Sequence, residues 1–291
     1  MMGRPIVTAV DGSRESMLAA EWAAREATRR GAPLRIVSAP GLLPRMRTYQ
    51  APATTVANAL HGLAARALAD AVDRVGEVAP GILIDTGLLE DPPAVGVANS
   101  GAGARLLVVG ARGTGGFAAL LLGSVSRYAV THARCPVVVV REENRAVHRE
   151  IVVGVRDPDE ADTTLGFGFE EAALRDATLT AVHVLSWYPL GSAPPATAEQ
   201  AASRHLGAVL DRWRQKYPEV TAGAEVIHGH PAHVLASRSA RADLVVIGRH
   251  GVGDGRAASS IQHAVLGHAC GPVAVVPSGG DGSDDGDGHP A

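Results

Sequence analysis

The sequence predicts two α/β domains of the same fold, joined head to tail. Three observations support this prediction: a length of 291 residues, a set of segments that recurs in order, and short apolar runs that alternate with longer helix-like stretches. This length is about that of two domains. Alternating strands and helices are typical of a parallel sheet with right-handed crossovers and helices on both faces.

Five segments of the first part of the chain recur in the second part in the same order. The pairs are RPIVTAVD (4–11) and REIVVGVR (149–156), GAPLRIVSA (31–39) and DATLTAVHV (176–184), EDPPAVGVA (90–98) and HGHPAHVLA (228–236), RLLVVGARG (105–113) and DLVVIGRHG (243–251), and HARCPVVVV (132–140) and HACGPVAVV (268–276). Such ordered self-similarity indicates a duplication. We predict a first domain over residues 1–141, a charged connection, and a second domain over residues 149–277.

The apolar runs of the first copy are continuous, as expected of strands that are buried on both faces of a sheet. They predict strands at Ile6–Val10, Leu34–Val37, Ile82–Ile84, Leu106–Val109 and Val137–Val140. If the last strand of each copy lies at a sheet edge, its unpaired hydrophobic backbone favours association. We therefore expect the two copies to pack through Val137–Val140 and Val273–Val276 as a pseudo-two-fold pair.

The segments between the strands carry helix signals. Ser13 is a suitable N-cap for a first helix, and Gly31 is a suitable C-cap for the same helix. Leu18 and Trp22 would share one face of that helix, and a second helix is expected near Val56–Val78.

Composition and charge exclude several classes of protein. The net charge of −3 gives no basic field for nucleic acid or anionic membrane, and no apolar run is long enough to span a bilayer. The first ten residues lack a signal-peptide pattern, and two cysteines do not make a disulfide framework. These features predict a cytoplasmic protein. The Gly/Asp-rich stretch 278–291 is predicted to be a disordered tail, because it ends before the glutamate that a calcium loop requires.

A glycine-rich loop after the fourth predicted strand has the chemistry of an anion site. Gly110-Ala111-Arg112-Gly113 is followed by nine residues, then by Gly123-Ser124-Val125-Ser126 and a helix-like segment. Glycines allow the backbone to approach a phosphate, and consecutive N–H groups with a helix N-terminus attract its charge. The hydroxyls of Ser124 and Ser126 can donate as well. The alternative is that these glycines only turn the chain.

The loop matches neither of two common phosphate motifs. It has no GK[ST] sequence, since Lys216 is the only lysine of the chain, and it does not follow the first strand as a dinucleotide fingerprint does. The Ala/Leu run at 118–122 inside it is expected to belong to the core.

These motifs together resemble the universal stress protein family. The resemblance rests on VVGARGTGGFAALLLGSVSRYAVTHARCPVVVVR (108–141), VDGS (10–13) and DPPA (91–94), and it covers nearly all of residues 4–141 and, more loosely, 149–277. The family implies a five-stranded parallel sheet in the order 3-2-1-4-5, of the adenine-nucleotide α-hydrolase-like type. It also implies ATP, with or without Mg²⁺, across the strand ends.

The resemblance also implies roles for individual residues. Asp11 would meet the ribose or the metal–phosphate region, although a helix-capping role for Asp11 is the alternative. The backbone of Ala39 would meet adenine and Gly110 would lie by the ribose. The phosphates would lie at Gly113, Gly123, Ser124 and Val125, with Ser126 in the same turn.

The second copy departs from this pattern. Arg156 stands in place of Asp11, and Ser259-Ser260 stands in place of Gly123-Ser124. The interval after Gly248-Arg249-His250-Gly251 is two residues shorter. A side chain and a shorter loop both hinder phosphate access, so the second copy is expected to be degenerate as a nucleotide site.

No metal ligand or catalytic residue is assigned. His228, His230 and His233 are spaced as ligands can be, but a solvated loop is the better interpretation, because the first copy has no histidines there. Cys135 and Cys270 are expected to be buried and inert. No Ser-His-Asp order or paired carboxylates are present at a spacing that catalysis requires.

The sequence therefore predicts a cytoplasmic tandem universal stress protein that binds ATP or a related adenine nucleotide in its first domain. It would act in a stress response by nucleotide-dependent binding or signalling, with slow hydrolysis at most. The alternatives are a nucleotide-independent protein-interaction module of the same fold and a catalytic member of the wider α-hydrolase-like group. No nucleic acid or membrane partner is expected, and no sequence feature supports further homodimerisation.

Overall fold

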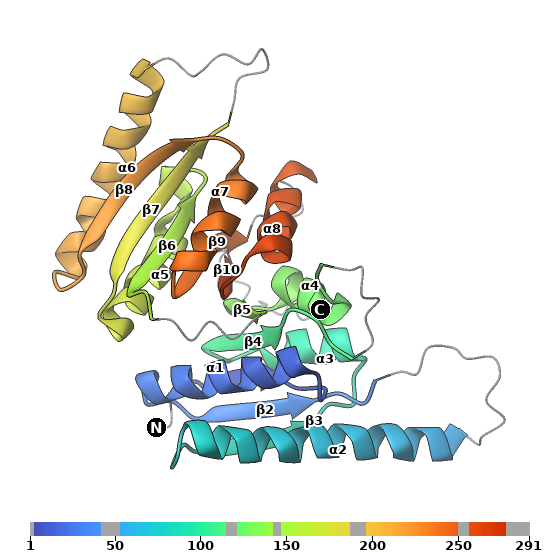
Figure 1. Ribbon diagram of the computed structural model, residues 1–291. Helices are drawn as coiled ribbons and strands as arrows, with labels where there is room; N and C mark the ends of the chain where they lie inside the picture. The colour runs from blue at the N-terminus through green and yellow to red at the C-terminus, as the bar shows by residue number, and fades with distance from the viewer. Residues whose placement is uncertain are drawn as a thin grey trace, which may run out of the picture.

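The computed structural model describes residues 3–41, 53–114, 121–141, 147–186, 196–249 and 256–277. We call the elements up to β5 half one and those from β6 onward half two (Figure 1). Half one consists of β1 (Ile6–Ala9), α1 (Arg14–Arg30), β2 (Leu34–Ser38), α2 (Ala53–Val78), β3 (Ile84–Leu88), α3 (Pro93–Ser100), β4 (Leu106–Gly110), α4 (Ser124–His132) and β5 (Val137–Val140). Half two consists of β6 (Glu150–Val155), η1 (Pro158–Glu160), α5 (Asp162–Arg175), β7 (Thr178–Leu185), α6 (Ala196–Lys216), β8 (Ala222–His228), α7 (Pro231–Arg238), η2 (Ser239–Arg241), β9 (Leu244–Arg249), α8 (Arg256–His268) and β10 (Val273–Pro277).

The ten strands form one continuous sheet in the order β3-β2-β1-β4-β5-β10-β9-β6-β7-β8. Within each half the neighbouring strands are parallel, and each half follows the order 3-2-1-4-5. The halves meet where β5 pairs with β10 in antiparallel fashion, with Val138 opposite Ala274. This confirms the predicted packing through the last strand of each copy, and it satisfies backbone groups that an open edge would expose.

Helices cover both faces of the sheet, and alternate residues of each strand face opposite layers. On one face Ile6 and Val108 pack with residues of α1, α2, α5 and α6. On the other face Val7 and Val109 pack with residues of α3, α4, α7 and α8. The continuous apolar runs of the central strands are thus explained by burial on both sides.

The first helix has the caps that the sequence predicts. The Ser13 Oγ atom accepts a hydrogen bond from the Ser16 amide, and Gly31 ends α1 in the left-handed region with φ of 58°. Leu18 is buried, and Trp22 packs against the same core. The second helix, α2, begins three residues before the predicted Val56 and ends at the predicted Val78.

The third strand differs from its prediction. The apolar run Ile82–Ile84 was expected to be a buried strand, but β3 begins at Ile84 and runs to Leu88. None of the five residues of β3 is buried, because β3 lies at the outer edge of the sheet. The predicted tail 278–291 lies outside the described residues.

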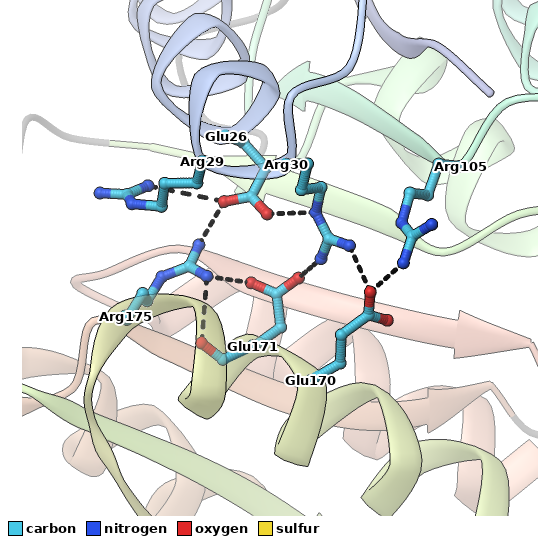
Figure 2. A network of polar contacts seen from close by, with 7 residues as sticks. All are labelled: Glu26, Arg29, Arg30, Arg105, Glu170, Glu171 and Arg175. Carbon is cyan, nitrogen blue, oxygen red and sulfur yellow. Dashed lines mark hydrogen bonds and ion pairs between the residues drawn. The ribbon is translucent and has the colours of Figure 1, made fainter. Parts of the chain in front are cut away.

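A network of charged side chains joins α1 to α5 across the two halves (Figure 2). The Arg30 guanidinium contacts Glu26 Oε1 at 2.5 Å, Glu170 Oε1 at 2.7 Å, and Glu171. The Arg175 guanidinium contacts Glu26 Oε2 at 2.6 Å and also Glu171. Glu171 and Arg175 stand 145 positions after Glu26 and Arg30, so the duplication makes this quartet pseudo-symmetric.

The quartet is almost fully withdrawn from water. The side chains of Glu26 and Glu171 are 0% exposed, and those of Arg30 and Arg175 are 3% and 6% exposed. Burial raises the pKa of the Glu26 carboxyl, but the charges of Arg175 and Arg30 outweigh burial and lower it overall. In Glu171, burial and the neighbouring Glu26 charge outweigh the two arginines, so its pKa is raised. Arg29 and Arg105 extend the network toward solvent through Glu26 and Glu170.

Candidate functional site

Gly110 lies where β4 meets the start of α1. A Cβ atom at Gly110 would lie 2.7 Å from the Glu15 carbonyl carbon and 2.8 Å from both the Glu15 oxygen and the Ser16 nitrogen. These are backbone atoms, so a side chain could be accommodated only by moving α1 away from the sheet. The glycine therefore allows the start of α1, which follows β1, to lie against the end of β4.

Asp11 reaches from the end of β1 to the loop after β4. Its Oδ2 atom accepts hydrogen bonds from the Thr114 amide at 2.8 Å and from Thr114 Oγ1 at 3.3 Å. Its Oδ1 atom accepts one from the Ser13 amide at 3.0 Å. The N-cap of α1 is Ser13, so the alternative in which Asp11 caps this helix is wrong.

The hydrogen bonds of Asp11 favour its charged form. Burial raises the pKa of the Asp11 carboxyl, but the hydrogen bonds from Ser13 and Thr114, with a smaller one from Ser16, outweigh burial and hold the pKa below its usual value. A carboxylate therefore stands beside the loop after β4, where it can serve as a metal ligand or as a hydrogen-bond acceptor.

Gly113 allows this carboxylate to lie against the loop. A Cβ atom at Gly113 would collide with Asp11 Oδ2. Thr114, the next residue, was not singled out by the sequence, although its amide and hydroxyl both donate hydrogen bonds to Asp11. In the sequence, the position of Thr114 directly after the second glycine was the only sign of this role.

Gly123 is the N-cap of α4 and lies against the same loop. Its amide donates to the Ala111 oxygen at 2.8 Å, and no side chain caps the helix. A Cβ atom at Gly123 would lie 3.3 Å from the Ala111 oxygen and 3.8 Å from the Gly113 nitrogen. The first N–H groups of a helix lack partners within the helix, so the α4 N-terminus offers donors beside Gly113.

The remaining predicted residues surround this point with different exposures. Ser124 is exposed at the start of α4, and Val125 is half-buried against the core. Ala39 is half-buried directly after β2, at the same end of the sheet as Asp11. Ser126 differs from its prediction: it is buried, and its hydroxyl donates to the Gly110 carbonyl at 2.5 Å. That hydroxyl holds α4 against β4 and does not point its hydrogen at a ligand.

Half two has a different arrangement at the equivalent point. In half one β4 ends at Gly110 and α4 begins at Ser124, but in half two β9 ends at Arg249 and α8 begins at Arg256. Ser259-Ser260, which aligns with Gly123-Ser124, therefore lies inside α8. The unpaired N–H groups of the helix start are displaced by about one turn along the chain. Gly251 lies outside the described residues.

The substitution of Asp11 is also visible in half two. Arg156 forms an ion pair with Glu160 at 2.8 Å, and Asp157 caps η1 by accepting from the Asp159 amide at 3.0 Å. These groups are engaged within their own turn.

An acidic hollow of about 380 Å³ lies beside the Asp11 turn, between Gly12 and α2. Its lining includes three acidic residues and one basic residue, namely Asp70, Asp73, Glu77 and Arg74, so its charge is acidic on balance and repels phosphate. The loop between β4 and α4 is therefore the better candidate for an anion.

Other features of the described part of the chain bear on the remaining expectations. Its helices include none that is long and apolar enough to cross a membrane, and its His, Cys, Asp and Glu side chains form no cluster of three suited to a metal. Cys135 is buried, and burial raises the pKa of its thiol to about 11. Cys270 is exposed, so the expectation that both thiols are buried is wrong for this residue, which follows the end of α8.

Comparisons with known proteins agree with the fold and the duplication. The model of the universal stress protein family matches residues 2–141 and again residues 148–277. A universal stress protein of Mycolicibacterium smegmatis is 32% identical over 288 residues, which cover 93% of this chain and 96% of that protein. One of Mycobacterium tuberculosis is 31% identical over 289 residues, with the same coverage.

Solved structures show the same architecture. A universal stress protein from Archaeoglobus fulgidus superposes with a TM-score of 0.71 at 16% identity, covering 95% of this chain and 97% of that one. A protein described as a putative universal stress protein from Pseudomonas aeruginosa gives a TM-score of 0.56 at 16% identity, covering 94% and 93%.

Proposed function

Since the chain belongs to the universal stress protein family, we propose that half one binds ATP or a related adenine nucleotide, with or without Mg²⁺. The observation that carries the proposal is the convergence of Asp11, Gly113 and Gly123 at the start of α4. Backbone N–H groups that converge at a helix N-terminus stabilise a phosphate. Asp11 supplies a carboxylate for a bound cation or a ribose hydroxyl.

The proposed ligand site belongs to half one alone. In half two the helix start lies about one turn earlier in the chain, and Arg156 pairs with Glu160 where half one has Asp11. The proposed role is nucleotide-dependent binding or signalling in the cytoplasm, where free thiols such as Cys135 and Cys270 stay reduced. Hydrolysis, if any, would be slow, because the chain has a single lysine, far from this loop.

A second candidate is a protein-interaction module that needs no nucleotide. The observation in its favour is that Gly110 and Gly113 have structural reasons to be glycine, namely the approach of α1 and of the Asp11 carboxylate. Denaturing the purified protein and testing the supernatant for ATP or AMP distinguishes the two candidates. Nucleotide in the supernatant supports the first one.

We expect titration calorimetry of the full chain with ATP and Mg²⁺ to give a stoichiometry near one per chain. Asp11→Ala in half one is expected to weaken binding, and Asp157→Ala in half two is its matched control and should leave binding unchanged. Two equivalent sites, or binding that responds only to the control, would refute the asymmetry.

Replacing Gly123 with serine is expected to weaken ATP binding about tenfold, which corresponds to about 1.4 kcal/mol. Serine is a favoured N-cap, so α4 should still form, while the added side chain stands between the helix start and Gly113. The φ of −68° at Gly123 also suits a serine. Calorimetry measures the affinity, and Gly62→Ser on α2 is the control. Unchanged affinity in a folded Gly123→Ser protein would disprove the placement of the phosphate.

A further inference from the structure

The loop that enters α4 lies against a helix of the other half. A Cβ atom at Gly267, near the end of α8, would lie 3.2 Å from both Cβ and Cδ1 of Leu121. Leu121 stands two residues before Gly123. Of the Ala/Leu run 118–122, which was expected to be core, residues 118–120 lie outside the described residues, Leu122 packs against the core, and Leu121 is 51% exposed. Its contact with α8 gives this leucine a place between the two halves.

One arginine bridges the same two segments. Arg141, directly after β5, donates from Nη2 to the Leu121 carbonyl at 2.5 Å and to the Leu266 carbonyl at 2.9 Å. Leu121 belongs to the loop of half one and Leu266 to the last turn of α8. A guanidinium at these two carbonyls fixes the separation of the loop from α8 and complements the negative end of the helix dipole.

The other end of α4 also contacts half two. Arg249, the last residue of β9, donates from Nη1 to the Ala133 carbonyl at 2.5 Å. Ala133 is the C-cap residue of α4. Half two therefore contacts both ends of α4. It contacts the C-terminus of the helix itself, and it contacts the loop that leads into the N-terminus and carries Gly123.

We propose that half two acts as a positioning element for the ligand site of half one. Gly267 and Arg249 are the positioning residues, and Arg141 bridges the loop to α8. The inference rests on the proposed nucleotide site. A phosphate is bound well only when the N–H groups of the loop and of α4 converge on one point, so a small displacement of α4 weakens binding. Half two thus contributes to a site that it does not itself contain.

The test uses the full chain and a matched pair of helical glycines. Gly267→Val introduces a side chain against Leu121. Gly207→Val adds the same side chain to α6, where no atom beyond the helix's own backbone and the two neighbouring residues lies within 4 Å of an added Cβ. We expect Gly267→Val to lower the ATP affinity at least tenfold by calorimetry and Gly207→Val to leave it within twofold. Adding Leu121→Ala to Gly267→Val removes Cγ and Cδ1 of Leu121 and leaves its Cβ atom as the remaining close neighbour, so it should restore part of the lost affinity.

A second readout needs no nucleotide. Hydrogen exchange of the amides 122–127 in the ligand-free protein should become faster in Gly267→Val, and unchanged exchange there would overturn the inference even if the wild-type protein binds no ATP. Absence of ATP binding by the wild type would instead refute the proposed function. Equal ATP affinities of the two valine variants, or no rescue by Leu121→Ala, would also overturn the inference. If Gly267→Val does not fold, Arg141→Gln tests the same bridge, with a several-fold loss of affinity expected.

Discussion

Replacing Arg30 with methionine is expected to lower the free energy of unfolding by about 3–5 kcal/mol. The substitution removes the guanidinium that contacts Glu26, Glu170 and Glu171, and it leaves two fully buried carboxylates with Arg175 as the main opposing charge. An uncompensated buried charge costs far more than the loss of an exposed ion pair. Chemical denaturation followed by circular dichroism measures the change.

Arg25→Met is the matched control for this experiment. Arg25 lies on the same helix and pairs with Glu21 at 3.2 Å, but its side chain is 45% exposed. The same change of charge should there cost no more than about 1 kcal/mol. Equal losses in the two variants would show that the quartet between α1 and α5 has no special energetic weight.

The second large effect is expected at Gly110. Gly110→Ala should lower the free energy of unfolding by about 2–3 kcal/mol, because the added methyl group meets three backbone atoms of α1 within 2.8 Å. Backbone atoms cannot rotate aside as a side chain can, so α1 must shift relative to β4. The same denaturation experiment measures this loss.

Gly76→Ala provides a control of opposite sign. Gly76 lies inside α2, with no atom within 4 Å of an added Cβ, and alanine is favoured over glycine in a helix by up to about 1 kcal/mol. We therefore expect Gly76→Ala to stabilise the protein. Stabilisation by Gly110→Ala would mean that α1 and β4 do not approach as closely as described.

Most of the fold could be predicted because local pattern and tertiary role agree. Ser13 and Gly31 mark the two ends of α1. They could be predicted because a capping hydroxyl and a left-handed C-cap residue depend only on the sequence next to the helix end. The pairing of β5 with β10 follows from valine-rich strands that would otherwise leave an open edge. The position of β3 was missed, because its polar sequence IDTGL suits an edge strand and carries no apolar periodicity.

The candidate site could be predicted at the level of residues and less well at the level of roles. Asp11, Gly113 and Gly123 are brought together as the motif indicates. The hydroxyl of Ser126 donates instead to the backbone carbonyl of Gly110. That carbonyl lies 16 positions away in sequence, so the local motif does not reveal the contact. The partners of Arg30 in half two are likewise invisible to local patterns, because Glu170 and Glu171 lie 140 and 141 positions away in sequence.

The antiparallel pairing of β5 and β10 within one polypeptide changes how the two halves respond to dilution. The chain passes from Val140 at the end of β5 to Glu150 at the start of β6, so the pairing is a unimolecular event. Two partners joined by a short connection meet at an effective concentration on the order of 10⁻³ M. The interface that carries the quartet and the contacts to α4 therefore stays formed at low protein concentrations, at which two separate chains would part.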